Sequence, residues 1–125
     1  MKDQNSDARA SEVAAIIGMI GGQLGDETSP FFLLVHMPMR PGAEQELRAT
    51  VSATRRKTLQ EQGALAFELY RDVSQPDRFI LHEGWRSLKD LERHLHTAHA
   101  AALTKEFNRL GSGAPEVHIC KVVAP

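Results

Sequence analysis

The chain has 125 residues, of which 42% are hydrophobic and 25% charged, a composition typical of a soluble domain with one hydrophobic core. Its 15 Lys and Arg residues nearly balance its 16 Asp and Glu residues, so it has no excess positive charge to attract nucleic acid. The only cysteine, Cys120, excludes an internal disulfide and fits a reducing compartment. The apolar run 13–20 is too short to span a membrane. We therefore expect a cytoplasmic protein whose partners include neither nucleic acid nor a membrane.

Residues 1–30 are predicted to form an N-terminal arm that precedes a domain over residues 31–125. Residues 1–10 are polar and predict a frayed terminus. With Ser11 as a candidate cap, apolar residues then follow at helical spacing: Val13, Ile16, Ile17, Ile20 and Leu24. The glycines and polar residues of 21–30 predict a linker. We expect a short amphipathic helix that docks on the domain or on a partner chain.

The domain is predicted to contain strands and helices in a regular order. Residues 31–37 form an apolar run typical of a strand, and 43–62 have helical periodicity up to Gly63. Residues 64–70 and 79–85 predict two strands joined by a turn that contains Pro76. Ser87 precedes the longest predicted helix, 88–110, which ends at Gly111, and 116–123 form the last strand.

This β-α-β-β-α-β order predicts a ferredoxin-like α+β fold, with an antiparallel four-stranded sheet and two helices on one face. Two helices cover only one face, yet the predicted strands place apolar side chains on both faces. A large exposed apolar face is uncommon in a monomer. We therefore expect a homodimer in which the two sheets pack together.

Candidate functional residues occur on the third predicted strand. Its period of two places Glu83 and Trp85 on the same largely apolar face as Phe79 and Leu81. A carboxylate therefore lies beside an indole. The alternative is a structural pair, in which a buried Glu83 accepts a hydrogen bond from a helix and Trp85 belongs to the core.

Three histidines lie on the long predicted helix. At about 100° per residue, His99 points along the apolar stripe, whereas His94 and His96 diverge from it. The three do not form a metal site by themselves, and a metal would need another carboxylate or histidine from a strand. An imidazole with a reference pKa of about 6.5 that faces an apolar layer is suited to act as a base near neutral pH. The alternative is a core His99 bonded to a backbone carbonyl.

Other features of the sequence carry less information about chemistry. His36, Tyr70, Arg71 and His82 are further candidates, each expected to be a solvated or interface side chain. The sequence contains no G-x-G-x-x-G, Walker or G-x-S-x-G motif. Nucleotide binding and serine-hydrolase chemistry therefore have no motif to support them.

The segment 79–87, Phe-Ile-Leu-His-Glu-Gly-Trp-Arg-Ser, is followed by Leu91-Glu-Arg-His94 and Thr97-Ala-His99. This combination resembles the antibiotic biosynthesis monooxygenase family, whose pattern is E-x-W-x-S, then L-x-x-H, then a second His five residues later. The segments 40–42 and 63–72 also resemble that family, and the resemblance covers roughly residues 33–123. The chain departs from the pattern at Ala100, where an aromatic residue is usual, and at Gln62, where proline is usual.

The resemblance implies a dimeric α+β barrel with a pocket in each subunit between the sheet and the helices. Relatives oxygenate anthrones, quinols or related polyphenols with O2 and without metal or flavin. The resemblance thus implies a cofactor-free monooxygenase for a small aromatic substrate, with no metal. Its expected catalytic residues are His99 or His94 as the base, Trp85 as a stacking wall and N–H donor, and Glu83 as an orienting group. The expected substrate-binding residues are His36, Phe67, Leu81 and Leu95.

Two alternatives accompany this expectation. One is haem degradation on the same fold. It requires an axial ligand to the haem iron on the second helix, and Thr104 stands at the position expected for that ligand. The other is a dimeric binding or stress-response module that sequesters an aromatic metabolite without changing it. The oxygenase hypothesis depends on a chamber between the second helix and the sheet, into which Trp85 and His99 both project.

Overall fold

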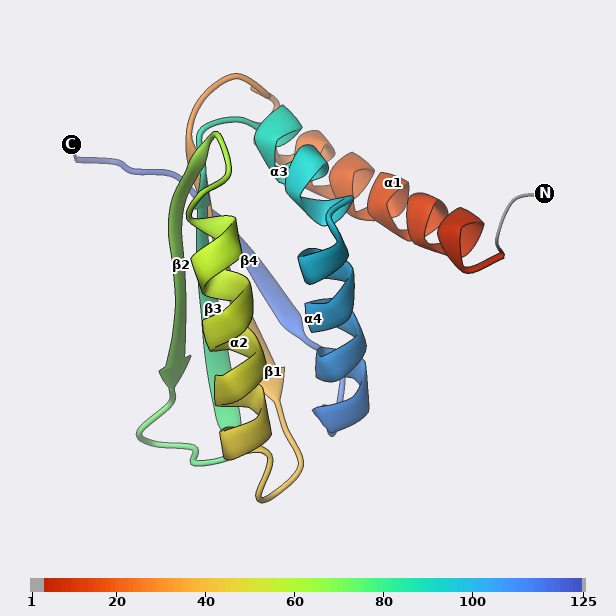
Figure 1. Cartoon of the computed structure of the whole chain (residues 1–125). Helices are drawn as coiled ribbons and strands as arrows, with labels where there is room; N and C mark the ends of the chain where they lie inside the picture. Colours follow the sequence, from red (N-terminus) through yellow and green to blue (C-terminus); the bar gives the residue numbers. More distant parts are fainter. Residues whose placement is uncertain (1–3, 125) are drawn as a thin grey trace.

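The computed structural model describes residues 4–124, whose strands form one open four-stranded sheet (Figure 1). The strands are β1 (Phe31–Pro38), β2 (Ala64–Arg71), β3 (Arg78–Trp85) and β4 (Glu116–Cys120). They lie in the order β2-β3-β1-β4, and each neighbouring pair is antiparallel. This is the predicted ferredoxin-like α+β fold, and the predicted hairpin of β2 and β3 is confirmed.

The helices of the domain lie on one face of the sheet. They are α2 (Glu44–Thr58), α3 (Leu88–Leu95) and α4 (Ala98–Leu110), and α1 (Gln4–Leu24) precedes them. Figure 1 shows α2 and α4 side by side in front of the sheet, and the two helices are in contact. α1 packs against α3 and also contacts β4.

The core lies between this helical layer and the inner face of the sheet. Alternate residues of β1 and β3 are buried there, as the period of two predicts. The inner face contributes Phe31, Leu33, Met37, Phe79, Leu81, Glu83 and Trp85. α2 buries the predicted stripe, which consists of Leu47, Val51, Thr54 and Thr58.

The prediction of one helix over 88–110 is wrong, because the chain breaks after Leu95 and resumes as α4 at Ala98. The hydroxyl of Thr97 donates a hydrogen bond to the carbonyl of His94 at 2.7 Å and accepts the N–H of Ala100 at 3.2 Å. Threonine at an N-cap satisfies a backbone donor that the first turn of a helix leaves free. Thr97 therefore ends α3 and begins α4.

The N-terminal helix is also longer than predicted. The predictions of a frayed segment and of a cap at Ser11 are wrong over the described residues, because α1 runs without a break from Gln4 to Leu24. The predicted linker is confirmed only for residues 25–30, since residues 21–24 belong to α1. Its predicted apolar stripe is confirmed, and Val13 and Ile20 are almost completely buried. A Cβ atom on Gly21 would lie 3.0 Å from the Leu88 side chain. Close packing on α3 thus outweighs the low helix propensity of glycine, which costs about 1 kcal/mol per residue.

Two other element boundaries differ from the prediction. α2 ends at Thr58 rather than near Gln62, and a turn connects it to Gly63. Gly63 has φ of +87°, and a Cβ atom there would lie 2.2 Å from the carboxyl carbon of Asp90, so the chain requires glycine at this position. β4 ends at Cys120 rather than Val123, which is exposed.

The outer face of the sheet is not covered by any helix in the described part of the chain. Phe32, Leu34 and Ile80 are half-buried there by their neighbours in the sheet. The same face holds His36, whose ring centroid lies 5.2 Å from that of His118. Within residues 4–124, no helix combines the length and the apolar character needed to cross a membrane.

Candidate functional site

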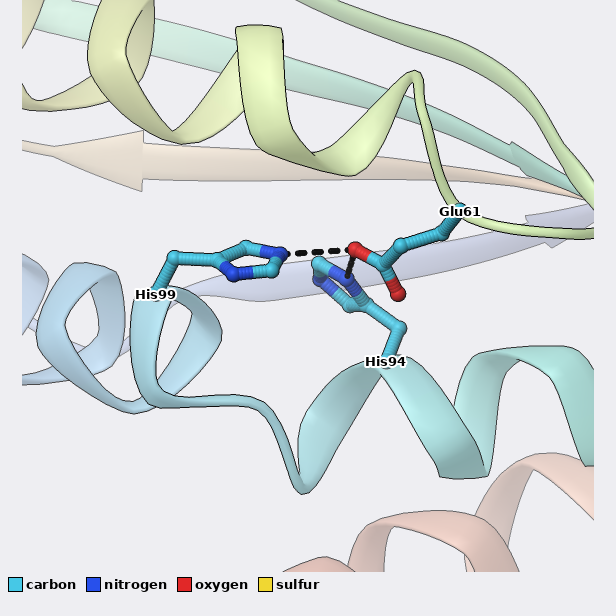
Figure 2. A group of neighbouring side chains, drawn as sticks. All are labelled: Glu61, His94 and His99. Atoms are coloured by element: carbon cyan, nitrogen blue, oxygen red, sulfur yellow. Dashed lines mark hydrogen bonds and ion pairs between the residues drawn. The ribbon is translucent and has the colours of Figure 1, made fainter.

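A group of polar side chains lies between the sheet and the helices at the end of the molecule where α2 leads into β2. Two come from β3, one from the turn after α2, one from α3 and one from α4. These are Glu83, Trp85, Glu61, His94 and His99. Figure 2 shows the two histidine rings pointing toward the carboxylate of Glu61.

The carboxylate of Glu61 joins the two histidines. One of its oxygens, Oε2, lies 2.8 Å from Nδ1 of His94 and 2.7 Å from Nε2 of His99. An ionised carboxylate can only accept hydrogen bonds, so both of these ring nitrogens carry a proton when the histidines are neutral. The lone pair is then on Nε2 of His94 and on Nδ1 of His99.

The prediction that the histidines diverge is wrong for His94 and His99. It assumed one continuous helix, whereas the break at Thr97 changes the direction of α4 relative to α3. His94 is the buried histidine, with 3% of its side chain exposed, compared with 16% for His99. His96 is exposed and remains outside the group.

Sequence reasoning did not find Glu61. This residue lies in the turn between α2 and β2, where its N–H donates to the carbonyl of Thr58 at 2.9 Å. The signal that could have found it is its place two residues before Gly63, because a tight turn there brings the end of α2 against the start of α3. Asp90, at the start of α3, indeed lies directly against Gly63.

Aromatic rings enclose His94. Its ring centroid lies 4.7 Å from that of Trp85 and 6.0 Å from that of Phe67. Trp85 and Phe67 are 0% and 1% exposed. Burial lowers the pKa of His94, an effect that its hydrogen bond to Glu61 opposes. His94 is therefore neutral near pH 7, in the form that can accept a proton.

Glu83 is the second buried titratable group of the site. The indole N–H of Trp85 donates to its Oε1 at 3.2 Å. Burial raises the pKa of Glu83 to about 7, although the hydrogen bond from Trp85 opposes this shift. The site thus contains a carboxyl group with a raised pKa and an imidazole with a lowered pKa, and burial is the main cause of both shifts.

The expected chamber that holds both Trp85 and His99 is not formed. His94 contacts both rings, since its centroid also lies 5.7 Å from that of His99. His99 instead lines a groove of about 360 Å³ between α2 and α4, together with Thr54 and Lys57. Trp85 is not part of the wall of this groove.

A different cavity, of about 290 Å³, has the expected roof and floor but lies on the flank of α4 that faces α1. Ile16 of α1, Val35 of β1 and Thr104 of α4 are among its wall residues. Ile16 and Val35 also pack against the apolar cluster that contains Trp85. This cavity therefore lies beside the apolar cluster to which Trp85 belongs.

An arginine of α1 links this cavity to the break between α3 and α4. Arg9 donates to the carbonyl of Leu95 at 2.8 Å and to Oγ1 of Thr104 at 3.3 Å. Its positive charge contributes to the lowered pKa of His94. The N-terminal helix α1 thus packs on the domain and also forms one wall of the cavity.

The structure separates the predicted substrate-binding residues. Phe67 lies beside His94, Leu81 lies in the core cluster with Met37, and Leu95 is partly buried next to Arg9. His36 lies on the outer face of the sheet, away from the other three.

Three weaker candidates also lie away from the site. Tyr70 and His82 interact with each other on the outer face, with 3.2 Å between the hydroxyl oxygen and Nδ1. Arg71 forms an ion pair with Glu44 at the start of α2. None of these contacts reaches the group around Glu61.

Replacing Glu83 tests the effect of its burial on stability. Because the folded-state pKa is about 7 and the ordinary value is 4.5, the folded state is favoured at low pH and loses stability as the pH rises from about 4.5 to about 7. Glutamine does not titrate, so we expect Glu83→Gln to remove this loss. The free energy of unfolding of the variant minus that of the unaltered protein should therefore increase by up to about 3 kcal/mol between pH 5 and pH 8.

Denaturant unfolding at several pH values measures this difference. The contributions of the other titrating groups to stability are shared by the two proteins and largely cancel. Glu68→Gln is the control, because this carboxylate lies at the surface beside Arg55. If the difference in free energy of unfolding between Glu83→Gln and the unaltered protein does not change with pH, the raised pKa of Glu83 is contradicted.

Comparison with known proteins identifies the family and the fold of the chain. The family model described as antibiotic biosynthesis monooxygenase matches residues 30–106. No curated protein matches the chain. α1 precedes the matched region, so the wall that it adds to the cavity lies outside the family match.

Solved structures show the same fold. A candidate antibiotic biosynthesis monooxygenase from Caulobacter crescentus has a TM-score of 0.74 at 17% identity, over 82% of this chain and 98% of that chain. Another from Nitrosomonas europaea has a TM-score of 0.73 at 17% identity, over 80% and 95%. A protein from Mycobacterium tuberculosis has a TM-score of 0.70 at 24% identity, over 78% and 98%. Since the family match covers more than half of its residues, the chain belongs to the antibiotic biosynthesis monooxygenase family.

Proposed function

We propose that the chain is a cofactor-independent monooxygenase that uses O2 to oxygenate a small aromatic compound of the quinol, anthrone or polyphenol class. Family membership supports the class of reaction. The observation that carries the proposal is the state of His94, which is buried between aromatic rings and bonded through Nδ1 to Glu61. A neutral imidazole with its lone pair on Nε2 and with little water around it is a competent general base.

The proposed reaction begins with removal of a proton from the substrate. The base takes a proton from a phenolic hydroxyl or an anthrone methylene group, and the resulting anion donates one electron to O2. The substrate radical and superoxide then combine to form a carbon–oxygen bond, and the peroxide regains the proton from the imidazolium. For an anthrone, loss of water from the hydroperoxide leaves a carbonyl, so that one oxygen atom of O2 enters the product and the other enters water.

The side chains of the site have distinct roles in this proposal. His94 is the base, and His99 shares the carboxylate that orients it. Trp85 supplies an apolar wall beside His94, and its indole N–H holds Glu83. Glu83, with a pKa of about 7, can donate or accept a proton near neutral pH. General-base catalysis of this kind typically contributes about 10²- to 10⁴-fold to the rate.

Trp85 and His99 do not share a cavity wall, so the proposal places the aromatic substrate in the cavity between α1, α4 and β1 in place of the expected chamber. Its volume of about 290 Å³ is near the lower end of the range for small-molecule pockets. Val35, Met37 and Phe107 give it apolar walls. For the substrate to contact His94, the side chains between this cavity and Trp85 must move aside. Leu95, which is partly buried and packs against the cluster that contains Trp85, is the proposed gate.

Haem degradation on the same fold is less well supported. Thr104 lines the cavity, but its hydroxyl donates to the carbonyl of Ala100 and accepts a hydrogen bond from Arg9. The wall residues of this cavity include no histidine, cysteine or tyrosine. Its wall therefore lacks the histidine, cysteine or tyrosine that commonly ligates haem iron, although it contains the thioethers of Met37 and Met39.

Oxygen consumption by chelator-treated protein tests the proposal. With a panel of quinols and anthrones, we expect uptake that falls by about 10²-fold or more in His94→Gln and by a smaller factor in Glu61→Gln, which loses the negative charge that orients the ring. His96→Ala is the control, because His96 is exposed and outside the site. With ¹⁸O2, the product should carry one labelled oxygen atom.

Two results would contradict the proposal. Unchanged oxygen uptake in His94→Gln would contradict the assignment of His94 as the base. A compound that binds and is recovered unaltered under both air and nitrogen would identify the chain as a binding module.

We also propose that the chain acts as a homodimer through the outer face of its sheet. The half-buried Phe32, Leu34 and Ile80 support this proposal, because their apolar surface has no cover within the described residues. Light scattering at micromolar concentration should give the mass of two chains.

Leu34→Glu should give the mass of one chain, since a charge at the centre of an apolar interface is costly to bury. Val73→Glu is the control, because Val73 is 94% exposed in the loop between β2 and β3. A monomeric unaltered protein, or a Leu34→Glu variant that remains a dimer, would contradict the outer-face interface.

A further inference from the structure

We propose that Glu61, His94 and His99 form a binding site for a divalent transition-metal ion such as Zn²⁺ or Co²⁺. This inference goes beyond the proposed oxygenase function and does not depend on it. The three residues offer two imidazole nitrogens and one carboxylate oxygen, a ligand set that suits Zn²⁺ and its neighbours in the first transition series.

The ligand atoms converge on one place. One ligand atom from each of the three residues lies within 4.8 Å of the other two. Oε2 of Glu61 is 2.8 Å from Nδ1 of His94 and 2.7 Å from Nε2 of His99. Ligand distances to Zn²⁺ are about 2.0–2.2 Å for nitrogen and oxygen. An ion between the three atoms would therefore need only small movements of the side chains, with the Glu61 carboxylate retreating from its hydrogen bonds.

The backbone holds the three ligands from separate directions. Thr97 fixes the break that turns His99 toward His94, through its bonds to the carbonyl of His94 and the N–H of Ala100. The turn that carries Glu61 is bonded to α2 through Thr58 and lies against α3 at Gly63. A site that exists before the ion binds loses less conformational entropy on binding.

The site has an entry path and room for further ligands. His99 lines the groove between α2 and α4, which opens to solvent. Its other wall residues include Lys57 and Thr54. Three protein ligands leave at least one position for water, as in zinc sites that are not purely structural.

Metal binding would change the chemistry of His94. The ion would take the lone pair of Nδ1, so the ring proton would move to Nε2, which is the proposed basic nitrogen. The same residues would therefore serve either as a base or as a metal site. Zn²⁺ would act as an inhibitor of an oxygenase that uses this base.

Another histidine pair must be distinguished from this site. On the outer face, His118 forms an ion pair with Glu116 at 2.9 Å, and its ring lies next to that of His36. These side chains are exposed or half-buried at the edge of the sheet. A binding experiment that counts only bound ions would not tell the Glu61, His94 and His99 site from the His36 and His118 pair. Variants at both places are therefore needed.

The test measures Zn²⁺ binding by calorimetry and Co²⁺ binding by visible absorption, with the full chain after chelator treatment. We expect one tight site per chain, with Co²⁺ bands typical of low coordination number and a higher melting temperature in the presence of Zn²⁺. Glu61→Gln and His99→Ala should each weaken Zn²⁺ binding by at least about tenfold. His96→Ala and His118→Ala should bind as the unaltered protein does. Circular dichroism checks that each variant is folded.

Three results would overturn the proposal. These are the absence of a Co²⁺ spectrum, a Zn²⁺ affinity that is unchanged in both folded Glu61→Gln and folded His99→Ala, and a loss of binding in His118→Ala alone. Because no substrate is used, a failed oxygen-uptake experiment leaves this result unaffected, and a failed metal experiment leaves the oxygenase proposal standing.

Discussion

The organisation of the site depends on one carboxylate oxygen. Oε2 of Glu61 accepts hydrogen bonds from both His94 and His99. Because a carboxylate can only accept, this contact decides which nitrogen of each ring carries the proton. The position of the lone pair, and with it the direction in which His94 can act as a base, follows from the turn after α2.

Two local features of the backbone make that contact possible. Thr97 divides the helical region after β3, and so brings together two histidines that a continuous helix would separate. Gly63 allows the turn after α2 to pass against Asp90 at the start of α3. Each feature depends on a single residue. Together they place Glu61, His94 and His99, which come from three different segments, within hydrogen-bonding distance.

The fold was largely predictable from the sequence, and the site was only partly so. Alternation along β3 correctly placed Glu83 beside Trp85 on the inner face, because a strand has a fixed period. The histidines were placed wrongly, because the apolar stripe continued past Thr97 and gave no sign of a break. Glu61 was missed because turns position side chains through tertiary contacts, which no periodic pattern encodes. The length of α1 was underestimated because packing against α3 stabilises a glycine-containing helix.

The chain therefore combines the family fold with an N-terminal helix that lies outside the family match. α1 adds Ile16 to the cavity wall and Arg9 to the junction of α3 and α4. The buried groups have pKa values shifted in opposite directions, upward for Glu83 and downward for His94, and burial is the main cause of both shifts. Such pairs of shifted groups are frequent where protons are transferred.

The most direct test is the ¹⁵N NMR spectrum of the histidine side chains in labelled, metal-free protein. Long-range nitrogen–proton correlations distinguish the two neutral tautomers and the charged ring. If Glu61 orients the site as described, His94 at neutral pH is uncharged with its proton on Nδ1, and this state is lost in Glu61→Gln. A His94 ring that is charged, or that carries its only proton on Nε2, would contradict the account.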